Sequence, residues 1–274
     1  MKASEMRADV FFARHPVFTR TELAAYCEAS GTCGERAVER LLSYHTRRGN
    51  LLRVRRGLYV VVPVGMDPES VPVDAYLVAS KMSDDAVLAY HTALEVHGFA
   101  YSTTDLLIYL TRHRDTRRAT FRSMTFQPVL VSKPLRDRGE PDPGITTADR
   151  SGLDVRLTTL ERTLVDVLDR PDLGGGWEEV WRSLESVPFL DLNEVVDYAL
   201  LLGNATTVAK VGLFLEQHQD TLSVDNEHLQ RLRMHAPVGP HSIRRGAGGS
   251  NVFLPTWNLV VPRAIVDRTW EEVT

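Results

Sequence analysis

Arginine is the residue type most able to do chemistry in this chain, and several arginines fall at regular spacing between residues 17 and 62. The planar guanidinium group carries five N–H donors, an arrangement that fits phosphate oxygens and the O6 and N7 atoms of guanine. This is the chemistry of binding, and it suits a polyanion such as DNA. The candidate DNA-binding residues are Arg36, Arg40, Ser43, Tyr44, Arg47, Arg48, Arg53, Arg55 and Arg56.

Two helices are expected to position the first of these side chains. The tetrads Thr19 to Glu22 and Thr32 to Glu35 both have capping-box spacing, in which the threonine hydroxyl and the glutamate satisfy early backbone N–H groups. The second tetrad predicts a helix from about residue 33 to residue 48. Gly49 is a suitable left-handed residue just beyond its end.

The predicted helix over residues 33–48 has two different faces. Its apolar stripe consists of Val38, Leu41, Leu42 and His45. Its opposite face consists of Arg36, Arg40, Ser43 and Arg47, with Tyr44 at the flank. At about 100° per residue the two stripes lie roughly 180° apart. A solvated charged face is the alternative interpretation, but the near-exclusive use of arginine favours nucleic-acid contact.

A basic hairpin is expected to follow this helix. Arg53 and Arg55 alternate with apolar residues, and residues 58–62 form a second run of β-branched and aromatic residues. Gly57 supplies the turn, which would place Arg55 and Arg56 at the tip and within reach of phosphates. Two helices and such a hairpin predict a winged helix-turn-helix, in which Arg36 and Arg40 would reach base edges.

The charge distribution agrees with a DNA-binding module at the N-terminal end. Residues 1–64 hold 11 Lys/Arg and 6 Asp/Glu, a net charge of +5. The remainder holds 21 Lys/Arg (32 − 11) and 30 Asp/Glu (36 − 6), a net charge of −9. A basic module favours phosphate binding, and an acidic body limits indiscriminate association. We therefore predict two domains, residues 1–64 and residues 65–274.

Composition excludes several other classes of protein. Hydrophobic residues make up 43% and charged residues 25% of the 274 residues, as in an ordinary globular protein. The sequence lacks an apolar run of the length that a membrane span needs, and its first residues lack the apolar core of a signal peptide. Cys27 and Cys33 do not have metal-binding spacing. We expect a cytoplasmic protein with reduced cysteines, no cofactor and no metal.

The remainder of the chain predicts an α+β body with a helical segment. The strongest buried-strand pattern is residues 105–111, and residues 119–131 predict a second strand or hairpin. The other expected elements are helices at 73–82, 84–97, 159–168, 177–184, 193–201, 205–217 and 226–234, a loop at 136–144, paired strands at 145–148 and 153–157, and a returning strand at 257–261. The fold class is α+β, with a winged helix-turn-helix and a larger mixed α/β C-terminal domain.

Several segments together resemble the AbiEi family of antitoxins from abortive-infection (type IV) toxin–antitoxin systems. The most specific are the wing segment within residues 47–60 and the segment 158–171, Thr-Thr-Leu-Glu-Arg-Thr-Leu-Val-Asp-Val-Leu-Asp-Arg-Pro. Similar segments lie at residues 17–25, 78–81, 208–216 and 257–262. The resemblance therefore extends over nearly the whole chain.

The resemblance implies an antitoxin that also represses its own promoter. The winged helix would bind inverted repeats in double-stranded promoter DNA, with cooperativity between monomers or weak dimers. The larger domain would counter a cognate nucleotidyltransferase-like toxin, directly or indirectly. The resemblance maps the wing and second-helix arginines to Arg36, Arg40, Arg47, Arg48, Arg53, Arg55 and Arg56. Gly31 and Gly34 make the entry to the second helix richer in glycine than the family pattern.

A second basic run follows the strongest predicted strand, within residues 112–122. It is either a solvated loop or a surface for the toxin, for the nucleic-acid substrate of the toxin or for additional DNA. The residues of this possible partner surface are Arg112, Arg114, Arg117 and Arg118.

The sequence contains little that indicates a catalytic site. The triple glycine at 174–176 is not followed by Lys-Ser/Thr, so it is not a P-loop. His91 and His97 are six residues apart and cannot act as i, i+4 metal ligands, and Asp166 with Asp169 is interpreted as an ion set on a helix surface. We expect no enzyme activity. The alternatives are a stand-alone repressor that responds to a small ligand and a nucleic-acid enzyme that docks through its winged helix.

Overall fold

The N-terminal part of the chain has the element order of a winged helix-turn-helix. A computed structural model describes residues 3–31, 34–114, 116–139, 141–243 and 250–268. Its first elements are α1 (Ala3–Arg14), β1 (Val17–Thr19), α2 (Arg20–Ala29), α3 (Glu35–Arg47), β2 (Leu51–Arg55) and β3 (Leu58–Val61). The three strands form an antiparallel sheet in the order β1-β3-β2, and α1, α2 and α3 pack on it around a core that contains Phe11, Phe18 and Leu23.

The start and end signals of these helices are partly as predicted. The capping box of α2 is present, because Glu22 N donates to Thr19 Oγ1 and Thr19 N donates to Glu22 Oε2. The N-cap of α3 is Gly34, not Thr32, so the second predicted cap was wrong; Thr32 and Cys33 lie outside the described residues. Gly49 has a φ of 76° just after the C-cap of α3, which confirms the predicted end.

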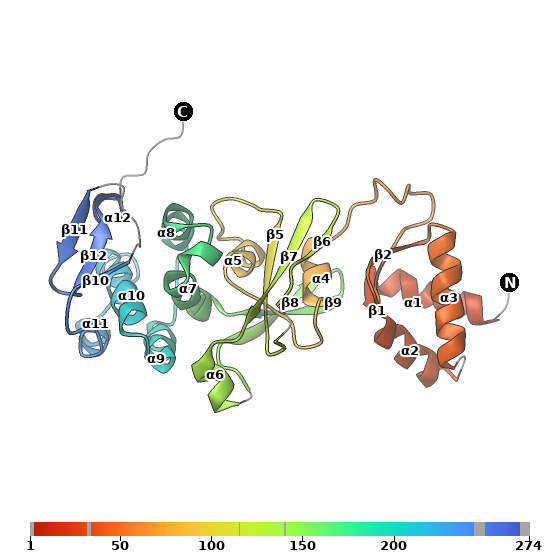
Figure 1. The fold of residues 1–274 in the computed structure, drawn as a ribbon, viewed down its shortest axis with the longest axis horizontal. Coiled ribbons are helices and arrows are strands. Elements are labelled where there is room, and N and C mark those ends of the chain that lie inside the picture. The colour runs from red at the N-terminus through yellow and green to blue at the C-terminus, as the bar shows by residue number, and fades with distance from the viewer. Residues whose placement is uncertain (1–2, 32–33, 115, 140, 244–249, 269–274) are drawn as a thin grey trace.

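A six-stranded mixed sheet forms the centre of the body (Figure 1). Its strand order is β6-β7-β5-β4-β9-β8, with β5 parallel to β7, β4 parallel to β9 and the other neighbours antiparallel. The strands are β4 (Val87–Leu88), β5 (Leu106–Thr111), β6 (Ala119–Phe121), β7 (Met124–Leu130), β8 (Ile145–Arg150) and β9 (Leu153–Thr158). The predicted hairpin at 119–131 and the predicted pairing of 145–148 with 153–157 are confirmed.

Alternate residues of this sheet belong to two different buried clusters, as the period of two in a strand requires. Leu107 and Tyr109 of β5 share a cluster with α4 (Ala75–Ser80) and with residues of the winged-helix sheet. The residues that the winged-helix sheet contributes are Val17, Leu58 and Val60. Ile108 and Leu110 of β5 share the other cluster with the C-terminal helices. The central sheet therefore joins the N-terminal and C-terminal parts through its two faces.

Helices pack on the second face of the sheet and, farther from it, on one another. They are α5 (His91–His97), α7 (Leu160–Asp169), α8 (Trp177–Glu185), α9 (Leu192–Leu202), α10 (Ala205–Gln217) and α11 (Asn226–Arg233), with a short 3-10 turn at Pro171–Leu173. Their bounds agree with the predicted helices at 159–168, 177–184, 193–201, 205–217 and 226–234 within two residues. The fold as a whole is α+β.

A third, small sheet lies in the C-terminal part of the chain. Its strands are β10 (His241–Ser242), β11 (Asn251–Leu254) and β12 (Leu259–Pro262), in the order β10-β12-β11, and α12 (Arg263–Asp267) follows. Trp257 is fully buried, and a Cβ atom on Gly212 of α10 would lie 2.2 Å from its ring. Glycine at this position is what lets the indole lie against the backbone of α10.

Two sequence predictions about the body were wrong. Residues 84–97 are not one helix, because Val87 and Leu88 form a strand between β5 and β9, and Tyr90, with a φ of 55°, separates it from α5. The loop predicted at 136–144 is partly helical, since α6 spans Lys133–Arg138. The strand predicted at 257–261 is present as β12, and it pairs with β10 and β11, which were not predicted.

Candidate nucleic-acid interface

The outward face of α3 carries the predicted arginine stripe. Arg36, Arg40, Ser43, Tyr44 and Arg47 are all exposed. Among the described residues, the side chains of Arg36, Arg40 and Arg47 form no hydrogen bond or ion pair. An arginine without an internal partner keeps all its donors for a ligand. The face that the sequence predicts for DNA is thus available.

The inward face of α3 fixes the orientation of this stripe. Val38, Leu42 and His45 are buried, and Asn50 Nδ2 lies 3.2 Å from His45 Nδ1 at the start of the wing. Apolar residues at this spacing determine how the helix rotates on the core. The exposed arginines therefore point away from α1 and the sheet as a direct result of the helical period.

An ion pair between helices sets the flank of the stripe. Arg20, the first residue of α2, donates to Glu35 Oε1 at 2.7 Å and to Glu39 Oε1 at 3.3 Å on α3. Arg20 N also donates to Gly57 O in the wing turn. One residue thus links α2, α3 and the wing, which are the three elements that a winged helix presents together.

Tyr44 and Arg48 form a pair at the C-terminal end of α3. Arg48 Nη1 donates to Tyr44 Oη, and the guanidinium carbon lies 5.4 Å from the ring centroid. Both side chains are exposed. The pairing holds the guanidinium against the ring without burying it, so Arg48 can still offer donors to a phosphate.

The wing differs from the sequence prediction at Arg55. Arg53, Arg55 and Arg56 are all exposed, and Gly57, with a φ of 82°, forms the turn. However, Arg55 Nη2 donates to the backbone oxygen of Met82, beyond α4. Arg55 therefore joins the wing to the body and is not the unpartnered tip residue that the sequence predicted, whereas Arg56 is exposed beside the turn.

A second contact ties the winged helix to the body. Lys81 Nζ donates to Glu22 Oε1, while Glu22 also caps α2. Burial alone would raise the pKa of Glu22, but hydrogen bonds from Lys81 and from the backbone of Thr19 outweigh it and lower the pKa below its ordinary value. The start of α2 is thus fixed to the end of α4 by an ionised carboxylate.

A groove of about 890 Å³ lies between α3, the wing and the segment after α4. Its basic lining residues are Arg20, Arg53, Arg55, Arg56 and Lys81, and its acidic ones are Glu22, Glu39 and Asp84. The groove therefore has mixed charge, in contrast to the purely basic outer stripe of α3. The stripe, not the groove, has the electrostatic character that a DNA backbone needs.

The second basic run is only partly a free surface. Arg112 donates to Gly139 O at 3.1 Å and forms an ion pair with Asp142 at 2.5 Å, so it holds the segment after α6. Arg112 therefore has a structural role, although the sequence predicts it as part of a possible partner surface. Arg114, Arg117 and Arg118 are exposed. Arg122 also has a structural role, because it donates to Pro68 O and Val71 O.

Asp166 of α7 is buried and Asp169 is half-buried, which corrects the interpretation of a surface ion set. Arg162 Nε donates to Asp166 Oδ2 at 3.2 Å, and Tyr198 Oη donates to Asp166 Oδ1 at 2.8 Å. The side chains of Arg162 and Asp166 are only 2% and 9% exposed. Asp169 accepts hydrogen bonds from Asn204 and Thr207 at the start of α10. The conspicuous 158–171 segment therefore serves packing.

His91 and His97, which the sequence analysis rejected as a metal-binding pair, contact different partners. His91 is buried, with its Nε2 3.0 Å from Glu179 Oε1 and its Nδ1 3.5 Å from Glu95 Oε1. Ser102 also donates to Glu179 from its backbone N and its hydroxyl. His97 Nε2 instead contacts Thr158 O at 2.8 Å. The His91 cluster fastens α5, α8 and the loop between α5 and β5 to one another.

Comparison with known proteins supports the fold alone. No protein-family model and no curated protein matches the chain. Among solved structures, the RV2827C protein from Mycobacterium tuberculosis is similar, with a TM-score of 0.57 and 17% identity over 95% of this chain and 92% of that chain. None of the helices in the described residues combines the length and apolarity that crossing a membrane requires. At this identity the likeness extends to the α+β architecture over most of both chains.

Proposed function

We propose that this protein is a DNA-binding autorepressor and the antitoxin of a toxin–antitoxin pair. The observation that carries the DNA-binding part is the exposed stripe Arg36, Arg40, Ser43 and Arg47 on α3, directly opposite the buried face of the helix. The stripe fits the major groove as a recognition helix does, with Arg36 and Arg40 nearest its N-terminal half. Arg47, Arg48, Arg53 and Arg56 are positioned to contact phosphates beside it.

The DNA-binding part is tested by comparing specific and non-specific binding. Affinity of the full chain is measured on duplexes from its own promoter region and on scrambled duplexes of equal length. Arg40→Ala should reduce binding to the promoter duplex more than to the scrambled one, because a lost guanine contact removes sequence readout. Arg56→Ala should weaken both about equally. The absence of any preference for the promoter duplex would refute the repressor role.

The antitoxin part of the proposal comes from the resemblance of segments such as 158–171 to the AbiEi family. The burial of Arg162 and Asp166 supports a scaffold role for that segment. The toxin partner would be nucleotidyltransferase-like and would meet an exposed surface of the body. Coexpression of this chain with the neighbouring gene should restore growth that the neighbouring gene alone arrests. Failure of the chain to restore growth would refute the antitoxin part and leave the repressor part standing.

A ligand-responsive repressor is the second candidate, and one cavity favours it. A hollow of about 710 Å³ lies between α1, the end of α3 and residues 61–68. Phe12, Val62 and Met66 give it apolar walls, and Arg48 lies at its border. An apolar ligand bound there would touch a predicted phosphate contact. Release of the promoter duplex by a metabolite extract, lost on Met66→Asp, would favour this candidate.

A further inference from the structure

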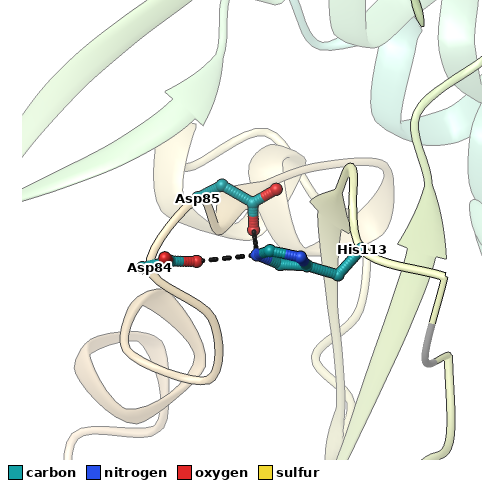
Figure 2. Close-up of side chains that lie close together, drawn as sticks. All are labelled: Asp84, Asp85 and His113. Atoms are coloured by element: carbon teal, nitrogen blue, oxygen red, sulfur yellow. Dashed lines mark hydrogen bonds and ion pairs between the residues drawn. The ribbon is translucent and has the colours of Figure 1, made fainter.

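Three potential metal ligands converge beside the groove, where no metal was expected from the sequence. Asp84 and Asp85 precede β4, and His113 follows β5 (Figure 2). The imidazole Nε2 of His113 lies 2.9 Å from Asp84 Oδ1 and 3.8 Å from Asp85 Oδ1. One ligand atom from each residue lies within 4.8 Å of the other two. The set brings one nitrogen and two carboxylate oxygens to a common point.

The antiparallel pairing of β4 with β5 creates this convergence. Val87 of β4 is paired with Leu110 of β5, so the segment before β4 and the segment after β5 leave the sheet at the same end. Asp85 is two residues before Val87, and His113 is three residues after Leu110. The juxtaposition is therefore a consequence of sheet register and does not depend on a chance approach of two side chains.

Asp85 is held in place from several directions. It accepts hydrogen bonds from Thr111 Oγ1 at 2.7 Å and from Arg112 N at 2.6 Å, and a further one from Ser83 Oγ. Thr111 Oγ1 also accepts from His113 N at 3.1 Å, so one threonine positions the segments of both ligands. Outer hydrogen bonds of this kind orient carboxylate ligands in metal sites.

The remaining two ligands face solvent. The side chains of Asp84 and His113 are 87% and 61% exposed, whereas that of Asp85 is 24% exposed. An ion at this point could therefore complete its coordination with water. The ligand atoms of Asp84 and His113 are already 2.9 Å apart, and because both side chains are exposed they can turn toward an ion without disturbing the buried core.

We propose that Asp84, Asp85 and His113 bind a divalent transition-metal ion, with Zn²⁺ as the cation that the ligands suit best. Imidazole nitrogen with carboxylate oxygens suits Zn²⁺, whereas Mg²⁺ and Ca²⁺ prefer an all-oxygen set. The bound ion would cross-link the segment after α4 to the segment after β5. Met82, which accepts the hydrogen bond from Arg55, lies in the first of these segments. The site does not depend on the proposed DNA-binding function.

Binding of the metal alone to the full, tag-free chain tests the site. Titration with Zn²⁺ in a calorimeter should show saturable binding at one site per chain, and Co²⁺ should give a visible d–d spectrum. His113→Ala and Asp84→Asn should each weaken binding at least tenfold. His235→Ala is the matched control, because it removes an exposed histidine just after α11, outside the candidate site, and should leave affinity unchanged.

The possible outcomes distinguish binding at this site from binding at a cysteine or at other residues. A Co²⁺ spectrum without a thiolate charge-transfer band, lost with His113→Ala, supports the nitrogen–oxygen site. A thiolate band would assign the ion to a cysteine and overturn the proposal. Binding that is unchanged in His113→Ala and Asp84→Asn would also overturn it, as would no saturable binding up to about 100 μM Zn²⁺, a level well above that of ordinary structural zinc sites. Circular dichroism of each variant shows whether it is folded.

Discussion

Arginine has opposite roles in α3 and in α7. Arg36, Arg40 and Arg47 are exposed on α3, and within the described residues their guanidinium groups have no protein partner. Arg162 on α7 is buried, pairs with Asp166 and donates to Pro143 O at 2.8 Å. Both helices repeat their apolar residues at the same period, so the difference lies in what packs outside them. α9 covers α7, whereas no described element covers the outer face of α3.

This difference separates arginines that maintain the fold from arginines that are free to bind. A buried guanidinium must satisfy its donors internally, since an unpaired buried charge costs several kcal/mol. An exposed guanidinium contributes little to stability and keeps its donors for a ligand. Variants of the two sets should therefore affect different measurements.

Arg162→Ala should destabilise the fold most. It leaves Asp166 buried without its cationic partner, and breaking a buried pair in this way costs about 3–5 kcal/mol of unfolding free energy. Urea denaturation followed by circular dichroism measures the loss. The double variant Arg162→Met with Asp166→Leu removes both charges and should recover most of it. A loss of unfolding free energy below about 1 kcal/mol in Arg162→Ala would mean that the pair behaves as an exposed one, and would contradict the distinction between the arginines of α7 and α3.

Arg36→Ala and Arg40→Ala should have the reverse pattern. Each should weaken binding to the promoter duplex by about 1–3 kcal/mol and change the unfolding free energy by no more than about 0.5 kcal/mol. Fluorescence anisotropy with a labelled duplex and urea denaturation provide the two readouts. Glu28→Ala, at an exposed position of α2, is the control for a charge change away from the stripe. Stability losses larger than the binding losses would contradict the proposed division.

Arg55 and Arg56 test the division between neighbouring residues. Arg55→Ala removes the hydrogen bond to Met82 O and should lower the unfolding free energy by about 1 kcal/mol. Arg56→Ala should change the unfolding free energy by no more than about 0.5 kcal/mol. It should lower the slope of log affinity against log salt concentration by about the amount that one phosphate contact contributes. Equal effects of the two substitutions in both measurements would mean that the wing tip is not attached to the body as the structure has it.

Glu22 should give the smallest effect, and it should depend on pH. Its pKa in the folded protein is lowered, so its stabilising contribution is fully present above its unfolded pKa of about 4.3 and is lost as the pH falls through the folded value. Its side chain is 39% exposed, which keeps the contribution below about 1 kcal/mol. The stability difference between wild type and Glu22→Gln should stay constant above about pH 5 and shrink below about pH 4. A difference that grows on acidification would contradict the assignment.

Local patterns predicted the α3 stripe and most helices because the information lies within one element. Val38, Leu42 and His45 identify the buried face of α3 by spacing alone, and the opposite face follows from geometry. The same holds for α10, whose predicted bounds were confirmed in full. Expectations of this kind need no knowledge of which distant segment packs on the helix.

Features that depend on distant partners could not be predicted from the sequence. Arg55 donates to Met82, 27 positions away, and Tyr198 donates to Asp166, 32 positions away. β4 has only two residues, which is too short to show the alternation of apolar and polar residues that identifies a strand. The apolar residues around it fit a helix equally well. For the same reason the sequence predicts a helix that begins at Asp84 and a basic run that includes His113. Neither pattern indicates that these residues lie close together in the fold.

Val17, Leu58 and Val60 share an apolar cluster with the central sheet, and this affects how the winged helix and the body can be separated. A protease that cuts the exposed segment at residues 64–69 would sever the chain without separating the two pieces. They would co-elute in native chromatography and part only in denaturant. The same burial means that a different winged helix could not be grafted onto this body without reproducing that patch.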